Sequence, residues 1–248
     1  MNHNVTIKLD KKALMQKDNI KYLGVLLDEH LSWKQQISNV SKKVSRSVPI
    51  LFKLRHYMDT SMLKGLYYSL IHSHLVYGIE VWGSACVTDL DKIIVLQKKA
   101  IRVITFNEGV PDLPGPLCSS TPIFGRLELL KFHDIFELQI SKFVFLTLSS
   151  LTPSNFREWF NLNTNVHNHN TISNSEIITE HHFHVGTVQP TNKLHTKGSK
   201  LVNYGGKQLQ VVGPLVWNSL PSDIRDSKSL VSFKYHMKKY LIDQYIEN

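Results

Sequence analysis

Carboxylates are the side chains of this sequence that could hold catalytic magnesium ions, but their spacing does not favour such a site. Mg²⁺ prefers hard oxygen ligands, and a two-metal site needs carboxylates that converge on two neighbouring ions. No two aspartates are adjacent in the chain. Asp89 and Asp91 stand where a helix is expected to begin, and a negative charge there favours the helix dipole. Asp28 is expected only to end a strand, so we predict neither a catalytic residue nor a metal ligand.

A run of histidines is the second group with metal-binding chemistry. Imidazole binds zinc, but a structural zinc site needs four ligands in fixed geometry. The polar residues around the run favour a solvated loop over a metal site. The chain contains neither the Gly-x-Ser-x-Gly turn of a serine nucleophile nor a phosphate-binding loop. The histidines are His167, His169, His181, His182 and His184.

Basic side chains recur at helical spacing along two stretches, and they are the main functional signal in the residues. In each stretch the apolar side chains share one helical face and the basic ones share another. Such cations can neutralise nucleic-acid phosphates, which positions a backbone without reading its sequence. A solvated basic face without a ligand is the alternative. The candidate binding residues are Lys42, Lys43, Arg46 and Lys53 in the first stretch, and Lys98, Lys99 and Arg102 in the second.

Composition agrees with an anionic partner. The 248 residues carry a formal net charge of +9 and a pI near 9.4, so nucleic acid is the default partner and a membrane surface the competitor. Two cysteines exclude a disulfide framework. The N-terminus has no signal-peptide core, and no apolar run reaches the roughly 20 residues of a membrane helix. We expect an intracellular protein, nuclear or cytoplasmic, without membrane contact.

The elements that would position the basic residues are mostly helices. Residues 5–9 and 20–27 are rich in β-branched and aliphatic side chains, which predicts a β-hairpin with a long loop between them. Ser32 followed by Gln35 predicts a capping box that opens a helix, and Pro49 is expected to kink or split that helix.

Further helices follow. The pattern predicts one over 60–75 with Thr60 as its N-cap, and another over 89–105. Periodicity resumes over 123–148, and a terminal helix is expected over 229–245. Around the Gly-Gly pair, LVNYGGKQLQVVGP favours short strands. The expected fold class is mainly α with a small β component (α+β).

Several blocks, in this order along the chain, resemble one enzyme family. They are KYLGVLLD at 21–28, LIHSHLVYGIEVWG at 70–83, LQKKAIRVIT at 96–105, STPIFGRLELLKFHDIFELQ at 120–139, and the stretch from NYGGKQLQ to KKYL at 203–241. Together they are similar to the region that follows the catalytic palm in reverse transcriptases of non-LTR (LINE-type, jockey-like) retrotransposons. The ordered combination is specific, and it covers most of the chain.

The resemblance implies roles and an organisation. Tyr22, Leu23 and Gly24 would form the turn of the primer grip, which holds the 3′ end of the growing strand, and the basic helices would belong to a thumb that grips the template–primer duplex. The expected parts are a β-hairpin remnant of the palm (1–31), a thumb-like helical bundle (32–106), a linker (107–122), a helical C-terminal region (123–160), a flexible and partly disordered polar segment (161–200), and short strands plus a terminal helix (201–248).

The family's adjacent pair of metal-binding aspartates lies upstream of the KYLGV block, and this chain begins only twenty residues before it. We therefore expect a fragment without the palm, which binds template–primer nucleic acid, needs no cofactor because Mg²⁺ would belong to the palm, and has no polymerase activity. Two alternatives are a helical protein-interaction module, which could self-associate through surface that the palm would cover, and a decayed reading frame without selected function.

Overall fold

Two small antiparallel sheets open the part of the chain that the structure describes. The structure is a computed structural model and describes residues 8–9, 12–13, 17–106, 119–160, 194 and 209–245. Strand β1 (Lys8–Leu9) pairs with β2 (Lys12–Ala13), and β3 (Asn19–Tyr22) pairs with β4 (Val25–Asp28). The predicted pairing of 5–9 with 20–27 is therefore wrong. The second stretch folds back on itself through a two-residue turn, which closes a much shorter loop.

Helix α1 (Lys34–Leu54) is the longest described helix and carries the first basic stretch. It continues through Pro49, so the prediction of a split is wrong. Proline has no N–H to donate to the carbonyl of Ser45, four residues earlier. Because Pro49 and Ser45 are both exposed, water can reach that carbonyl instead. The predicted capping box is also absent. Trp33 is the N-cap with a positive φ of 64° and no side-chain hydrogen bond.

The second helical stretch is almost continuous. Helix α2 (Thr60–Tyr67) passes through the π-turn η1 (Tyr68–His72) into α3 (Ser73–Val76). Asp59, not Thr60, caps α2, because the Met62 N–H donates to the Asp59 carboxylate over 2.7 Å.

Two more helices complete the first bundle. The short α4 (Ile79–Trp82) leads to α5 (Val87–Ile104), which begins two residues before the predicted start and carries the second basic stretch. Helices α1 and α5 pack side by side, and the ends of both meet where the Arg55 guanidinium lies 3.6 Å from the centre of the Phe106 ring. The two helices therefore run in the same direction.

A buried glutamine joins α2, α5 and the start of α7. The Gln97 carboxamide donates to the Tyr67 hydroxyl (2.9 Å) and to the Leu130 carbonyl (3.0 Å), and it accepts from the Phe132 N–H (2.9 Å). Gln97 and Tyr67 are almost fully buried. Burial raises the pKa of the Tyr67 hydroxyl, which therefore stays protonated as a hydrogen-bonding group.

The predicted helix over 123–148 is two helices. Helix α6 (Thr121–Arg126) and α7 (Phe132–Leu148) are separated by a turn in which Glu128 has a φ of 51°. The Leu129 N–H donates to the Phe124 carbonyl and the Glu128 N–H to the Gly125 carbonyl, which is the Schellman pattern that ends a helix. Helical periodicity did not predict this break, because the residue with the left-handed conformation, Glu128, is neither a glycine nor a proline.

The C-terminal part is helical where short strands were predicted. Residues 209–214 belong to α9 (Leu209–Ser219), which is followed by α10 (Ser222–Arg225) and α11 (Leu230–Asp243). The Asn218 carboxamide both accepts from the N–H and donates to the carbonyl of Leu194, each over 2.8 Å. Residues 107–118, 161–193 and 195–208 lie outside the described part, and so does most of the predicted linker and polar segment.

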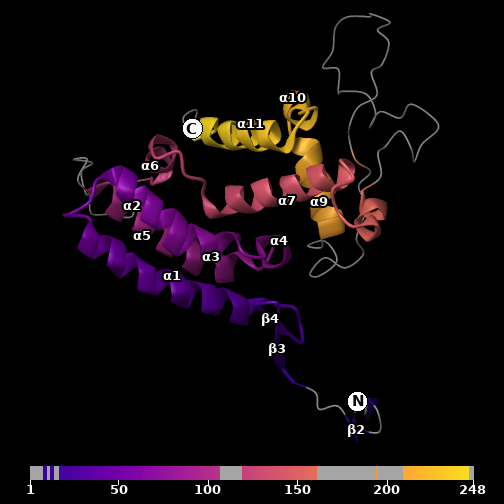
Figure 1. Ribbon diagram of the computed structural model, residues 1–248. Helices are drawn as coiled ribbons and strands as arrows, with labels where there is room; N and C mark the ends of the chain where they lie inside the picture. Colours follow the sequence, from indigo (N-terminus) through magenta and orange to yellow (C-terminus); the bar gives the residue numbers. More distant parts are fainter. Residues whose placement is uncertain are drawn as a thin grey trace, which may run out of the picture.

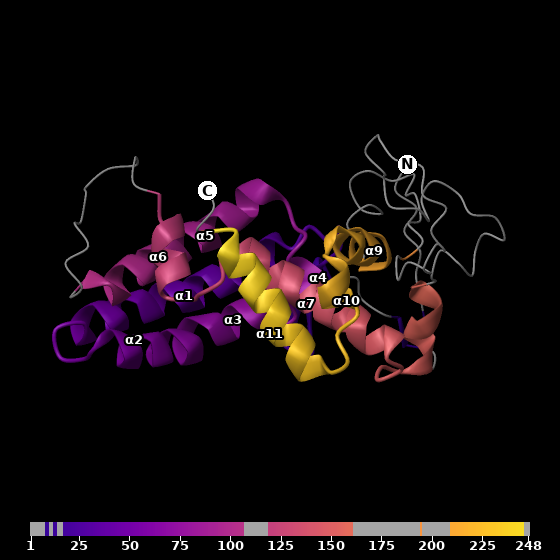
Figure 2. The same cartoon turned by 90° about the horizontal axis from the view of Figure 1, so that it is seen from above.

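Helix α7 lies at the centre of the arrangement. In Figure 1, the layer of α2, α3 and α5 lies between α1 and α7, and α11 covers the other side of α7. Figure 2 shows α11 crossing over α7. The Phe233 ring of α11 stacks on Phe145 and Trp217, with ring centroids 4.7 and 5.9 Å apart. Buried side chains from all these helices form one continuous core.

The prediction of a mainly α-helical fold with a small β component is confirmed. Among the described helices, none combines the length and the apolar character that a membrane crossing requires.

Candidate nucleic-acid interface

The hairpin turn expected at Tyr22–Gly24 is present in the structure. Tyr22 pairs with Val25, and Leu23 and Gly24 form the two-residue loop with φ values of 46° and 85°. Two consecutive positive φ angles are typical of the type I′ turn, whose twist matches that of a hairpin. Tyr22 and Leu23 are 62% and 75% exposed, so the turn presents its side chains to solvent. Contact of this turn with nucleic acid stays a prediction.

A tyrosine from the helical bundle holds the turn. The Tyr77 hydroxyl donates to the Leu23 carbonyl over 2.6 Å, and a Cβ added at Gly24 would lie 3.2 Å from the Tyr77 ring. The contact is reciprocal, because a Cβ at Gly78 (φ 63°) would lie 3.2 Å from a methyl group of Val25. The hairpin turn and the turn between α3 and α4 therefore each have a glycine at the point where they contact each other.

The loop between the hairpin and α1 is organised by Asp28. Its carboxylate accepts from the backbone N–H groups of Ser32 (2.8 Å), Trp33 (2.9 Å) and His30 (3.2 Å). Partial burial would raise the pKa of the Asp28 carboxyl, but these hydrogen bonds outweigh it and lower the pKa. The prediction that Asp28 only ends a strand is therefore incomplete, because Asp28 also orders the loop before α1. A second tie to α1 is the Leu26 N–H, which donates to the Gln36 side chain over 3.0 Å.

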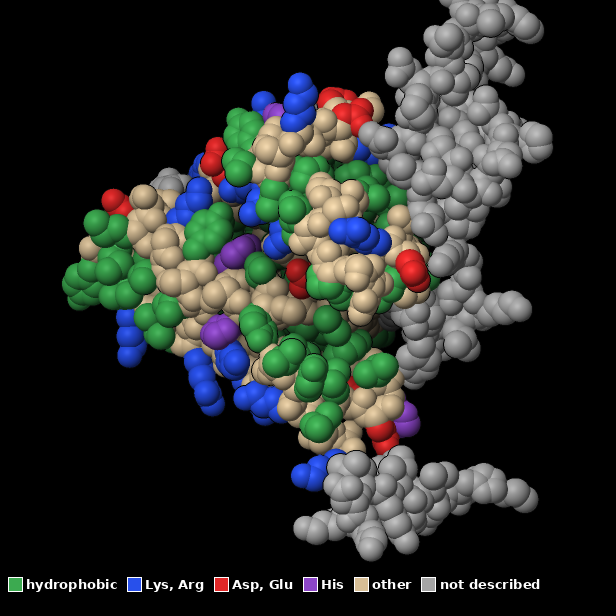
Figure 3. Space-filling view, turned by 45° about the vertical axis from the view of Figure 1, so that its right-hand side comes forward, with side chains coloured by type: hydrophobic (Ala, Val, Ile, Leu, Met, Phe, Trp, Pro, Cys, Tyr) green, Lys and Arg blue, Asp and Glu red, His purple; other side chains and the backbone are tan. Residues whose placement is uncertain are grey.

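The basic residues predicted on α1 all lie on its solvent side. Lys42, Lys43, Arg46 and Lys53 are exposed, and none of the four forms a salt bridge with a described residue. Lys and Arg side chains project from the side of the molecule formed by α1 (Figure 3). Residues 30–79 contain seven Lys and Arg but a single carboxylate, Asp59, which the cap of α2 already uses. We call the exposed basic side chains of α1 the α1 basic face.

Two histidines of the second helical stretch lie beside lysines of other helices. Lys43 lies close enough to His74 of α3 to add to the effect of burial, and the pKa of the His74 imidazole is lowered. Burial and the charge of Lys238 on α11 lower the pKa of His72 to about 4. The sequence does not place Lys238 beside His72, because the two residues are far apart in the chain.

The basic residues of α5 reach a different environment. Lys98, Lys99 and Arg102 are exposed, but Lys98 lies near Lys131 at the start of α7. Burial, together with the Lys98 charge, lowers the pKa of Lys131, although Asp134 opposes the shift. Because Lys43 lies towards α3 and Lys98 towards α7, the two predicted basic stretches do not form one cluster.

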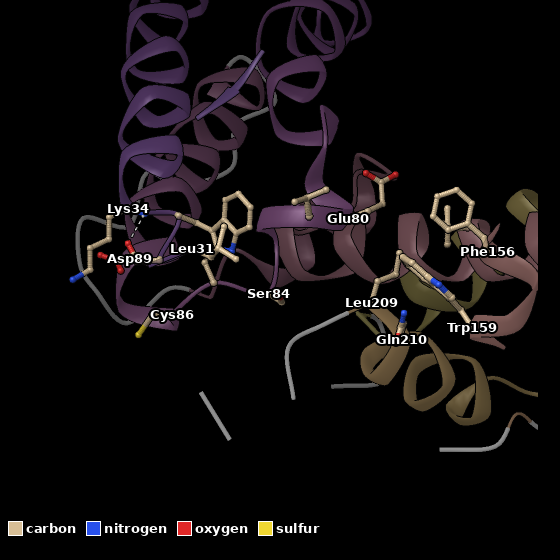
Figure 4. A pocket seen from close by; sticks show the side chains of 15 residues that line it. Leu31, Lys34, Glu80, Ser84, Cys86, Asp89, Phe156, Trp159, Leu209 and Gln210 are labelled. Carbon is tan, nitrogen blue, oxygen red and sulfur yellow. Dashed lines mark hydrogen bonds between the residues drawn. The ribbon is translucent and has the colours of Figure 1, made fainter. Parts of the chain in front are cut away.

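A pocket of about 880 Å³ lies between the start of α1, the start of α5, the 3₁₀ turn η3 (Ser154–Trp159) and α9. Leu31, Phe156, Trp159 and Leu209 give it largely apolar walls (Figure 4). Lys34, Glu80 and Asp89 are its charged residues, so both signs of charge occur at its edge. This mixture does not select an anionic or a cationic ligand.

Metal-ligating side chains do not gather in the described part of the chain, where no three of His, Cys, Asp and Glu could share an ion. Asp89 belongs to the first turn of α5, as the sequence predicted. The histidines from His167 to His184 lie outside the described residues.

Comparison with known proteins confirms the resemblance to retrotransposon polymerases. The chain is 30% identical over 103 residues to the RNA-directed DNA polymerase from the mobile element jockey of Drosophila melanogaster. It is 29% identical to the probable RNA-directed DNA polymerase from transposon BS and 26% identical to that from transposon X-element, each over 102 residues and from the same organism.

These similarities cover 40% of this chain and 11% of each relative, so the match spans about a tenth of the length of these proteins. No protein-family model and no solved structure matches the chain. The chain therefore contains a region related to retrotransposon RNA-directed DNA polymerases.

Proposed function

We propose that this region of a jockey-like RNA-directed DNA polymerase binds template–primer nucleic acid and does not itself add nucleotides. The observation that carries the proposal is the α1 basic face, in a stretch of fifty residues with one carboxylate. A phosphate backbone laid along this face meets cations that form no salt bridge with any described residue. Such contacts give affinity that depends steeply on salt.

In this proposal the hairpin forms a second part of the nucleic-acid interface, next to the α1 basic face. Its turn lies at the N-terminal end of α1, and Tyr77 and Asp28 hold its orientation relative to the helices. The family resemblance implies that Tyr22, Leu23 and Gly24 contact the 3′ end of a primer. In this proposal residues 32–106 act as a thumb, and the hairpin marks where the paired strand would end.

Nucleotide addition would need several carboxylates that converge on magnesium ions. The chain has no adjacent aspartates, and the described carboxylates do not group with other ligand residues. The proposal therefore expects no primer extension when the 248-residue chain receives primed template, deoxynucleotides and Mg²⁺. Measurable synthesis would contradict it.

Binding is tested by titrating a fluorescent RNA–DNA duplex with the chain at several salt concentrations. The variant carries Lys42→Glu, Arg46→Glu and Lys53→Glu together. Each lost phosphate contact lowers the slope of log K against log salt by about 0.9, so three contacts should lower it by about 3. Affinity at low salt should fall by at least about tenfold.

The matched control carries Lys228→Glu, Lys234→Glu and Lys239→Glu, which are exposed positions on α11 or just before it. This variant has the same net charge as the first. Equal losses in both variants would show that only overall charge matters, and they would exclude the α1 basic face as the binding surface.

A protein-interaction role is the second candidate, because apolar side chains are exposed on the C-terminal helices. Leu215, Val231 and Tyr235 are 55%, 78% and 65% exposed. Exposed apolar patches are typical of surfaces that meet a protein partner or a second copy. Self-association that is insensitive to salt, without duplex binding, would favour this candidate.

A further inference from the structure

An aromatic and cationic cluster forms one end of the helical bundle. The Arg55 guanidinium lies between two rings, 3.8 Å from the centre of Phe52 and 3.6 Å from the centre of Phe106. The His56 ring meets the edge of Phe106, with centroids 5.3 Å apart. The group therefore joins the end of α1 to Phe106, two residues after the end of α5. We call Phe52, Arg55 and Phe106, together with Tyr57 two residues after Arg55, the tip cluster.

The tip cluster presents its rings to solvent. Tyr57, in the turn that follows α1, is 86% exposed, and Phe52 is 50% exposed. Figure 3 shows hydrophobic side chains gathered at the end of the molecule where α1 meets α2. The stack on Arg55 fixes the ring planes of Phe52 and Phe106, so a flat ligand would find them already oriented.

Charge selects the class of ligand. Lys53 of the α1 basic face is adjacent in sequence to Phe52. Asp59, two residues after Tyr57, accepts a hydrogen bond as the cap of α2. Glu108, two residues after Phe106, lies outside the described residues. An aromatic surface that carries cations fits nucleobases joined by phosphates, because bases stack on aromatic rings and on guanidinium planes.

The distances along α1 fit a strand that continues past paired nucleotides. Lys42 and Lys53 are eleven residues apart in one helix, which is about 16 Å at 1.5 Å per residue. A duplex strand rises about 3.4 Å per nucleotide, so this length matches about five nucleotides. The hairpin lies at one end of that track and the tip cluster at the other.

We propose that the tip cluster stacks unpaired nucleobases of a strand whose paired part lies along the α1 basic face. This inference rests on the proposed function and specifies its substrate as a duplex with a single-stranded extension. The duplex part supplies phosphate contacts, and the extension supplies exposed bases.

The test compares a blunt duplex with the same duplex carrying a single-stranded extension that contains 2-aminopurine. The full chain should bind the extended form more tightly, and stacking should quench 2-aminopurine fluorescence. Base–aromatic stacking is worth about 1–3 kcal/mol per base. Tyr57→Ala should therefore weaken binding of the extended form by about 5- to 150-fold, while binding of the blunt duplex stays within about twofold.

Two further variants separate stacking from a folding defect. Phe52→Leu keeps an apolar side chain at the end of α1 but removes the ring, and it should lower the preference for the extended form. Tyr235→Ala removes another exposed tyrosine, from α11, and should leave that preference unchanged. Circular dichroism of each variant checks that the helices are intact.

Failure of this inference can be told apart from failure of the proposed function. If the wild-type chain binds the blunt duplex but shows neither quenching nor a preference for the extension, the tip cluster does not stack bases. A membrane surface is the competing anionic partner. If Tyr57→Ala loses binding to anionic vesicles but keeps its preference for the extension, the tip cluster contacts membranes and does not stack bases. If the blunt duplex does not bind at all, the proposed function itself is wrong.

Discussion

The hydroxyl of Tyr77 donates a 2.6 Å hydrogen bond to the carbonyl of Leu23, a residue 54 positions earlier in the chain. The bond joins the exposed turn of the hairpin to the connection between α3 and α4. A free two-stranded hairpin is only marginally stable in water. This contact, together with the Asp28 and Gln36 hydrogen bonds, keeps β3 and β4 in one orientation against the bundle.

Replacing Tyr77 by Phe should loosen the hairpin. The substitution removes one exposed hydrogen bond, which is worth about 1 kcal/mol, and leaves the ring against Gly24. Backbone amides of residues 19–28 should exchange with solvent about fivefold faster, while those of α1 should not change. Tyr22→Phe, in the exposed strand end, is the control. Unchanged exchange in the hairpin of Tyr77→Phe would show that the hydroxyl does not hold the turn.

Two glycine substitutions should change stability in opposite directions. Gly24→Ala places a Cβ 3.2 Å from Tyr77 at a φ of 85°, and we expect it to lower the free energy of unfolding by about 1–2 kcal/mol. Gly65→Ala lies within α2, where nothing would come within 4 Å of the new Cβ. It should raise the free energy of unfolding by about 0.5–1 kcal/mol. Urea denaturation measures both, and the same sign for the two would contradict the geometry.

Gln97→Leu should be among the most destabilising single changes in the bundle. It removes two donated and one accepted hydrogen bond at a fully buried site, leaving the Tyr67 hydroxyl, the Leu130 carbonyl and the Phe132 N–H without this partner. A buried unsatisfied group costs about 1–3 kcal/mol, so we expect a loss of about 3 kcal/mol in chemical denaturation. Gln35→Leu, on the exposed side of α1, should change stability by less than about 0.5 kcal/mol.

Stability should fall in mild acid because of His72. Burial and the Lys238 charge hold its pKa at about 4 in the folded protein, below the value of 6.5 expected when unfolded. The unfolded chain therefore takes up a proton first as the pH falls. Folded stability should drop between about pH 6.5 and pH 4 and level off below that window.

The size of that drop is about 2 kcal/mol, since part of the ring stays in contact with solvent. His72→Gln should flatten the stability profile across the window, as measured by urea denaturation at each pH. His236→Gln, on the exposed side of α11, is the comparison. An identical slope in the His72 variant and the wild type would rule out this residue as the cause.

Helical periodicity predicted most of the helices but not where they begin and end. The apolar arcs of α1 and α5 lie inward as expected, because a 3.6-residue period directly encodes which side is buried. The break at Glu128 was missed, since a charged residue rarely adopts positive φ and carries no turn signal of its own. The structure of the loop before α1 was not predicted, because the Asp28 carboxylate that orders it lies five residues before Trp33.

Tertiary contacts account for the other differences. The Gly-Gly pair at 205–206 favoured short strands on either side of it, yet Gly213 and Pro214 are buried within α9. A Cβ at Gly213 would lie 2.7 Å from Phe160, so the glycine serves close packing and not a turn. The proximity of Lys238 to His72 also depends on how α11 crosses the bundle, and no local pattern encodes that.

The candidate interface was partly accessible from the sequence. The family resemblance placed the hairpin turn at Tyr22–Gly24, whereas strand composition alone paired the wrong segments. The basic residues of α1 were identified by spacing, but spacing could not tell that those of α5 lie in other surroundings. Nor could it reveal the tip cluster, because Phe106 reaches Arg55 only when α1 and α5 run side by side in one direction.

The charge imbalance of residues 30–79 also affects how two copies of the molecule meet. The cations of the α1 basic face repel the same face on a neighbour, over about 10 Å at 0.1 M ionic strength. Multivalent buffer anions such as sulfate or citrate would bridge two such surfaces, whereas chloride would only screen them. The choice of anion therefore decides how closely concentrated molecules approach one another and which faces build a crystal.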